Sequence, residues 1–251
     1  PDDLPHSVLL QRALAEFRAF RDVLVEHGVM VTSVKGFEQC PDMVFPNCLS
    51  THRDDEGGIL YIYPMLNENR QAERDPALID MLEQSYAETR DLTGYEAHGR
   101  ALESTASIVM DRIHKVGYAG LSARSDDDLI KSWCAQMGYT PVIFNTQSHT
   151  AMPVYHTDCV MWIGSTLAGV CTQNIVAEDR TKVLGHLQTT HAVVEFDTEQ
   201  LKSFCGNALE VIGADGHRYL AMSTRAYNAL TPGQKDLILD HFKSILHSDL
   251  S

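Results

Sequence analysis

The chain has 251 residues, of which 44% are hydrophobic and 22% are charged, and its formal net charge at pH 7 is −14. This balance is typical of soluble globular proteins, and it excludes intrinsic disorder, collagen-like repeats and small disulfide scaffolds. The acidic surplus also argues against a nucleic-acid partner or an anionic membrane surface, because both bind through clusters of Lys and Arg.

Hydrophobic periodicity predicts a small number of helices. Residues 7–27 carry apolar side chains at helical spacing, with Ser7 as the expected N-cap and Gly28 as the stop. Further helices are expected at 76–90, from Asp126 to about Met137, and from Thr231-Pro232 to about Leu246.

Short apolar runs between these helices predict strands. They are expected at 29–34, 59–63, 108–110, 117–121, 141–144, 160–163, 167–172, 192–196, 208–212 and 219–222, the last two as a hairpin. The order strand–strand–helix–strand returns several times without an exact sequence repeat. No Pro/Gly/Ser linker divides the chain, so we expect one α/β domain over residues 1–251.

The six cysteines are scattered and form no CxxC pair, which gives no support to a zinc site. Neither a glycine-rich phosphate loop nor a GxSxG elbow is present, so we expect no cofactor and no metal. No charged-then-apolar leader is present and no apolar run approaches 18 residues, so free thiols in the cytoplasm are the natural interpretation. The cysteines are Cys40, Cys48, Cys134, Cys159, Cys171 and Cys205.

The segment around His156 is the most informative for chemistry. His156 and Asp158 alternate, so both would project from one side of an extended strand. The carboxylate could hold a cation while the imidazole moves protons. A metal site is the alternative, but no HExxH motif or second clustered His supports it.

Other polar residues allow both a functional and a structural interpretation. Asp42 and Asn47 lie in a turn-prone stretch, where Asp is usually a turn former. Glu103 precedes an apolar strand, where a carboxylate is costly unless it is paired. Arg124 could bind a carboxylate in bidentate fashion or pair with the acidic residues just after it. Cys205 is either a nucleophile or, more commonly for cysteine, a buried inert thiol.

Taken in order, several segments resemble the guanidino-group-modifying superfamily of arginine deiminases, dimethylarginine dimethylaminohydrolases and amidinotransferases, and most of all its citrulline-utilisation hydrolase-like branch. The resemblance covers nearly the whole chain. It rests on PDMVFPN (41–47), STH (50–52), YPMLNENRQAER (63–74), LESTAS with MDR (102–112), GLSARSD (120–126), PVYHTD (153–158), CGNALEV (205–211) and LAMSTRAYNAL (220–230).

The resemblance implies a fold and a reaction. The fold is a five-bladed α/β-propeller, or pentein, of ββαβ units around a pseudo-fivefold axis. The reaction is hydrolysis of a C–N bond in a guanidino or ureido amino acid of the arginine, citrulline or methylarginine class, through a covalent cysteine intermediate. The partner is thus a small molecule, and a homodimer is left open.

The same resemblance assigns roles to individual residues. His156 would be the general acid and base, with Glu103 orienting it or touching the guanidino group. Asp42 and Asp158 would hold the guanidino nitrogens, and Asn47 matches an adjacent substrate-binding position. The remaining two residues, Arg70 and Arg124, would bind the substrate carboxylate or gate its access.

The chain also departs from the superfamily pattern. The superfamily nucleophile is a Cys after a GGGSxRC-type turn, and none of the six cysteines matches that context. We therefore expect the nucleophile outside these 251 residues, together with an N-terminal strand. Ser104 and Ala106 replace two usual glycines, and Cys48 stands where relatives carry Asp or Asn. These departures leave open a ligand-binding relative without catalysis, and an amidinotransferase.

Overall fold

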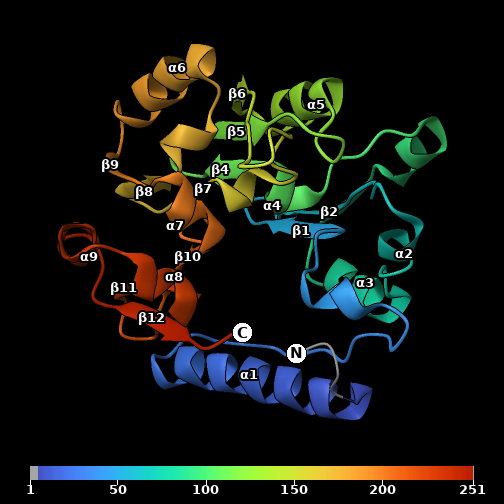
Figure 1. The fold of residues 1–251 in the computed structure, drawn as a ribbon. Coiled ribbons are helices and arrows are strands. Elements are labelled where there is room, and N and C mark those ends of the chain that lie inside the picture. The colour runs from blue at the N-terminus through green and yellow to red at the C-terminus, as the bar shows by residue number, and fades with distance from the viewer. Residues whose placement is uncertain (1–4, 251) are drawn as a thin grey trace. The chain divides into compact units, whose positions relative to one another are not determined.

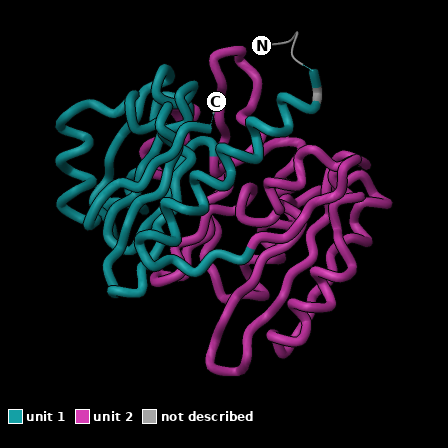
Figure 2. Tube along the Cα trace, turned by 90° about the horizontal axis from the view of Figure 1, so that it is seen from below, with its two compact units in different colours: residues 1–32, 159–174, 184–251 teal, residues 33–158, 175–183 magenta. Residues whose placement is uncertain are grey.

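The structure, a computed structural model, describes residues 5–250. The Cα trace divides into two compact units (Figure 2). Unit 1 comprises Pro1–Thr32, Cys159–Asn174 and Leu184–Ser251, and unit 2 comprises Ser33–Asp158 and Ile175–Val183. All seven residues that the sequence predicts for the site belong to unit 2.

Unit 2 contains two three-stranded sheets (Figure 1). One has the order β1 (Leu49–His52), β2 (Ile59–Ile62), β3 (Glu88–Asp91), and the other has β4 (Val109–Asp111), β5 (Val116–Gly120), β6 (Thr140–Phe144). In each sheet the first two strands are antiparallel and the third is parallel to the middle one. Each sheet is therefore one strand–strand–helix–strand unit, because only the parallel connection needs a helical crossover.

Two helices of unit 2 begin where a polar side chain satisfies a free backbone N–H group. Asp75 accepts from Ala77 N–H at the start of α3, and Asp126 accepts from Leu129 N–H at the start of α5. Gly138 ends α5 in the left-handed conformation that favours glycine. The helices are η1 (Pro41–Val44), α2 (Glu68–Gln71), α3 (Pro76–Glu83), η2 (Thr93–His98), α4 (Ser104–Ser107), α5 (Asp127–Met137) and η3 (Thr157–Cys159), whose last residue belongs to unit 1.

Unit 1 repeats this strand topology twice. Its sheets have the orders β7 (Met161–Ile163), β8 (Leu167–Val170), β9 (Ala192–Glu195), and β10 (Leu209–Ile212), β11 (Arg218–Ser223), β12 (Ile245–Ser248). Helix α1 packs against β12, and α8 packs against β11 and β12 (Figure 1). The remaining bounds are α1 (His6–Glu26), η4 (Thr172–Asn174), α7 (Thr198–Lys202), α8 (Thr224–Ala229) and α9 (Pro232–Leu239), with α6 (Ala177–Leu187) divided between the units.

Aromatic residues dominate the core of unit 2. Trp133 of α5 packs its ring 5.9 Å from Tyr61 and 5.4 Å from Tyr139, and Tyr61 stacks on Tyr63 at 5.6 Å. All four side chains are buried together with Leu102, the residue directly before Glu103. This packing fixes the backbone next to Glu103.

Most predicted elements are confirmed within a few residues, but three are wrong. The helix expected at 76–90 ends at Glu83, and 88–91 pairs with β2 instead. The helix expected to reach residue 246 ends at Leu239, and 245–248 pairs with β11. Residues 29–34 form no strand, and Val29 N–H binds Leu24 O at the end of α1.

The predicted cap of α1 is also wrong, because Pro5 occupies the N-cap and Ser7 lies inside the helix. The mixed α/β class is confirmed. The described residues form four small three-stranded sheets, none of them closed, so the closed five-bladed propeller and the single domain stay predictions.

Candidate active site

Glu103 lies at the centre of the candidate site. It occupies the N-cap position of α4 and is fully buried. Its Oε2 lies 2.6 Å from His156 Nε2 and accepts from Arg124 Nη1 at 3.1 Å, while Oε1 accepts from Leu66 N–H at 3.1 Å. The sequence predicts that a carboxylate here needs a partner, and the structure supplies three.

These contacts decide the protonation of the Glu103 carboxyl. Burial by itself would raise the pKa of Glu103, since it disfavours the charged form. The hydrogen bonds from His156, Leu66 and Arg124 outweigh burial and hold its pKa below the usual value. Glu103 is therefore an ionised hydrogen-bond acceptor for the imidazole.

His156 reaches Glu103 from the loop that follows β6. Its side chain is buried, and its ring lies 4.8 Å from that of the half-exposed Tyr155. The extended strand expected for His156 and Asp158 is wrong, because Asp158 lies in the 3-10 helix η3. The cause is the Thr157 hydroxyl, which donates to Ser107 O and draws the chain into a turn.

Arg124 comes from the loop between β5 and α5. The acidic residues just after it have other partners, since Asp126 pairs with Arg100 and Asp127 with Lys131, and Arg124 pairs with Glu103 instead. Its guanidinium also lies 5.8 Å from the Tyr155 ring centroid. Three residues that are distant in sequence, Glu103, Arg124 and His156, thus share one contact network.

The predicted substrate loop is held by a second, adjacent network. Arg70 of α2 is buried, and its Nη2 donates to Phe45 O at 2.7 Å, an oxygen that also accepts from Asn47 N–H. Asp42 lies exposed in η1 at the start of this loop. Arg70 therefore anchors the loop that carries Asp42 and Asn47, two of the predicted substrate-binding residues.

Glu73 pairs with a predicted site residue but was not itself predicted from the sequence. It is buried, and its Oε1 lies 2.6 Å from Arg70 Nε. Burial raises the pKa of Glu73, and the charges of Asp42 and Glu103 add to this effect against that of Arg70. The available signal was the Arg-x-x-Glu spacing within residues 70–73, since oppositely charged residues three apart are common ion-pair partners in and next to helices.

Four of the six thiols are poorly suited to nucleophilic attack. Burial raises the pKa of Cys48 and of Cys134 to about 11 and that of Cys205 to about 12. The pKa of Cys171 is raised as well, by burial and by nearby Cys205 and Cys159. Since the thiolate is the reactive form, these four residues are structural thiols.

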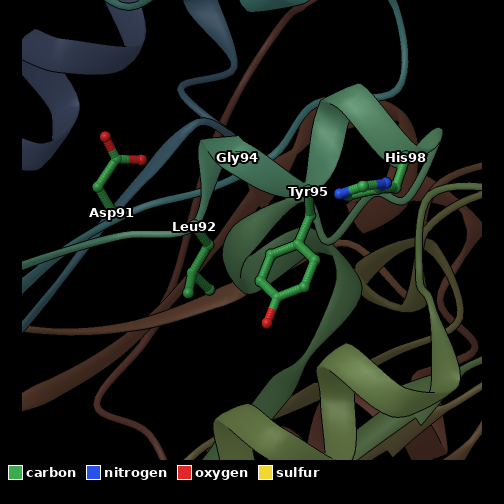
Figure 3. A pocket seen from close by; sticks show the side chains of 5 residues that line it. All are labelled: Asp91, Leu92, Gly94, Tyr95 and His98. Atoms are coloured by element: carbon green, nitrogen blue, oxygen red, sulfur yellow. The ribbon is translucent and has the colours of Figure 1, made fainter.

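One surface hollow of about 210 Å³ lies in unit 2, apart from the seven predicted residues. Figure 3 shows its lining side chains at the end of β3 and along η2. The lining residues are Asp91, Leu92, Gly94, Tyr95 and His98. Within residues 5–250, no helix combines the length and the apolar character needed to cross a membrane.

Several solved structures are similar to this chain. The N-terminal domain of ArgZ, an arginine dihydrolase from the ornithine-ammonia cycle in Cyanobacteria, has a TM-score of 0.73 at 17% identity, with 96% of this chain and 80% of that one covered. DDAH from Pseudomonas aeruginosa, complexed with citrulline, has a TM-score of 0.66 at 14% identity, with 96% and 82% covered. Both are variants in which a cysteine is replaced by serine.

AgrE in a ternary complex with ornithine and NAD⁺ has a TM-score of 0.75 at 17% identity, with 96% of this chain but 32% of AgrE covered. At these identities the likeness establishes a shared mixed α/β fold.

No curated protein matches the chain. The family model described as N,N dimethylarginine dimethylhydrolase, eukaryotic, matches residues 1–251. The chain therefore belongs to the eukaryotic N,N dimethylarginine dimethylhydrolase family and is a hydrolase that acts on C–N bonds.

Proposed function

We propose that the protein hydrolyses a C–N bond of a guanidino or ureido amino acid, of the arginine, citrulline or methylarginine class, with His156 as general acid and base. The buried contact between His156 and Glu103, at 2.6 Å, is the observation that carries this proposal. An ionised Glu103 lies within hydrogen-bond distance of the imidazole and orients it, as a buried carboxylate does in other acid–base sites. ArgZ bound to substrate and DDAH bound to citrulline support the substrate class.

The reaction divides into two balanced halves. A cysteine thiolate forms a C–S bond at the guanidino carbon, the C–N bond breaks, and protonated His156 gives its proton to the departing amine. Neutral His156 then takes a proton from water, whose oxygen bonds to the same carbon. The C–S bond then breaks, and its electron pair returns to sulfur. The product loses the remaining O–H proton to solvent and leaves as the neutral ureido compound.

The remaining predicted residues are proposed to bind the substrate. Asp42 and Asp158 would hold the guanidino nitrogens by charge-assisted hydrogen bonds, beside the amide of Asn47. Arg124, which is partly exposed, would face the substrate carboxylate, whereas Arg70 is buried against Glu73 and Phe45. These contacts favour Arg124 over Arg70 as the residue that meets the substrate carboxylate.

We propose that the cysteine nucleophile lies outside the 251 residues, since none of the six cysteines follows a GGGSxRC-type turn and burial raises the pKa of four of them. The structure of ArgZ covalently bonded to a reaction intermediate supports a covalent route. Intact-mass spectrometry of the natural protein tests the placement. A natural protein that ends at Ser251 and still turns over would contradict it.

The proposal also covers the closure of the fold, the cellular location and the oligomeric state. Four sheets of one topology support the closed five-bladed propeller, which an experimental structure of the natural protein tests. The six free cysteines suit the reducing cytoplasm, which localisation by fluorescence microscopy tests. Light scattering after size-exclusion chromatography decides whether the assembly is a homodimer.

The central test is the rate of amine release from arginine, citrulline and dimethylarginine in the natural protein. His156→Ala should lower kcat by about 10²-fold or more, the usual contribution of general acid–base catalysis. The control, His186→Ala, changes an exposed histidine of α6 and should leave the rate unchanged. Full activity in His156→Ala would contradict the assignment, and transfer of an amidino group to an added amine would favour an amidinotransferase.

A further inference from the structure

Two buried hydroxyl groups connect the three loops of the site. Ser107 at the end of α4 is fully buried, and Thr157 directly after His156 is 1% exposed. Neither residue is among the seven predicted for the site. Each hydroxyl donates one hydrogen bond and accepts another, so its single O–H donor is satisfied in its buried position.

Ser107 joins the Glu103 loop to the Arg124 loop. Its Oγ accepts from Glu103 N–H at 2.9 Å and donates to Arg124 O at 2.6 Å. Glu103 N–H also lies 3.2 Å from Arg124 O, so the two backbones are in direct contact. The Ser107 hydroxyl thus fixes the separation of the same two residues whose side chains form an ion pair.

Thr157 connects the His156 loop to Ser107. Its Oγ1 accepts from Gly120 N–H at 2.8 Å, at the end of β5, and donates to Ser107 O at 2.7 Å. Gly120 belongs to a strand of the unit 2 core, so Thr157 anchors the loop to a rigid element. His156, one residue earlier, has little freedom to move away from Glu103.

We propose that Ser107 and Thr157 are positioning residues that set the His156–Glu103 hydrogen bond. The 2.6 Å contact needs two loops, separated by 53 residues, to be held within a few tenths of an ångström. The side-chain contact alone leaves both loops free to hinge, whereas the two hydroxyls close a ring of hydrogen bonds behind it. Both hydroxyls bond to backbone groups, so they act through the positions of His156 and Glu103.

The test begins in the unliganded protein, where it does not depend on turnover. A short hydrogen bond between imidazole and carboxylate gives a proton resonance far downfield in the NMR spectrum, and His156→Ala assigns it by its loss. Thr157→Val removes the hydroxyl at nearly constant shape and should abolish the signal or shift it upfield. Thr157→Ser restores the hydroxyl and should restore the signal.

Ser125→Ala is the matched control. Ser125 is also buried and lies next to Arg124, but its Oγ has no hydrogen-bond partner within the described part of the chain. Its loss should leave the signal in place. If Thr157→Val does not fold, as judged by circular dichroism, Ser107→Ala carries the same test. A folded Thr157→Val or Ser107→Ala protein with an unchanged signal overturns the proposal.

The kinetic arm rests on the proposed function. In Thr157→Val, kcat should fall about tenfold or more with a smaller change in KM, because misplacement affects the reacting geometry more than binding. The acid limb of the pH profile should move to higher pH, since a weaker His156 bond no longer depresses the pKa of Glu103. Wild-type protein with the NMR signal but no turnover would reject the proposed function alone, and unchanged kinetics in Thr157→Val would overturn the positioning role.

Discussion

The free-energy cost of burying the Glu103 carboxylate is an argument that this residue has a functional role. A fully buried carboxylate contributes little net stability, because the loss of its hydration offsets the attraction of its partners. Its three hydrogen bonds nonetheless fix His156 and Arg124 in one arrangement. Under the proposed function, the arrangement serves the orientation of the imidazole more than the stability of the fold.

Ser104 allows a prediction at the same scale. Its φ is +52°, a left-handed conformation that favours glycine, and its Oγ donates to Leu49 O at 2.8 Å. Ser104→Ala keeps the strain and loses the bond, so it should lower the free energy of unfolding by about 1–2 kcal/mol. Ser104→Gly loses the same bond but relieves strain of about 1 kcal/mol, so it should be the more stable variant.

Urea unfolding of both Ser104 variants measures the difference directly. The comparison cancels the shared loss of the hydroxyl and isolates the backbone conformation at this position. An Ala variant at least as stable as the Gly variant would show that residue 104 carries no conformational strain. The Gly variant also restores the residue that the superfamily resemblance leads one to expect here.

At the site, the sequence could predict which residues matter but not how they meet. The pairing of Glu103 followed from the cost of an unpaired buried charge, and its partners are His156 and Arg124. The alternation of His156 and Asp158 was misread as a strand, because the Thr157 hydroxyl bond that bends the chain is a long-range contact. Glu73 was missed because its burial depends on packing that the Arg-x-x-Glu spacing does not reveal.

Among the elements, β1 carries a titratable group into the unit 2 core. His52 is buried, with its ring 5.4 Å from Trp133 of α5 and its Nε2 2.7 Å from Ser50 Oγ. Burial first, and then the charges of Arg112 and Lys115, lower the pKa of His52 to about 4. The fold thus holds the neutral imidazole.

The sign of the pH effect follows from proton uptake. Between pH 6.5 and about 4 the unfolded chain binds a proton at His52 and the folded chain does not, so stability falls as the pH is lowered through this window. The loss should total about 3 kcal/mol and level off below it. In His52→Gln this part of the pH dependence should disappear.

Urea unfolding at pH 7.5, 5.5 and 4 measures this dependence. His149→Gln, which changes an exposed histidine, is the control and should follow the wild type. A parallel decline in wild type and His52→Gln would show that His52 titrates normally in the fold. The experiment needs no substrate, so it tests the core of unit 2 independently of the proposed reaction.

Elements with strong periodicity were predictable, whereas those that depend on a partner strand were not. Helix α5 has an acidic cap, an apolar face and a terminal glycine, all visible locally. Strands β3 and β12 have four residues each and form only because β2 and β11 offer free edges. Helix α6 was missed altogether, since its sequence is polar and lacks a clear apolar stripe.

At the scale of the whole molecule, the charge excess and the site have different roles. Within the site, Glu103 pairs with Arg124 and Glu73 with Arg70, so the buried carboxylates are locally balanced. The net charge of −14 is therefore carried mainly by the rest of the chain. Such a surplus attracts a cation over a distance of about a Debye length, roughly 10 Å at 0.1 M salt.

The charge excess leads to a prediction for the proposed substrates, which differ in net charge. Arginine and dimethylarginine carry a net positive charge at neutral pH, whereas citrulline is a net-neutral zwitterion. If the surplus attracts the cation, kcat/KM for arginine should fall several-fold between about 20 mM and 500 mM NaCl, while that for citrulline should change by less than about twofold. Sucrose at matched osmolality controls for effects of solutes other than screening. Equal salt dependence for both substrates would mean that binding depends on the paired groups of the site alone, and that the acidic surplus contributes nothing to the capture of substrate.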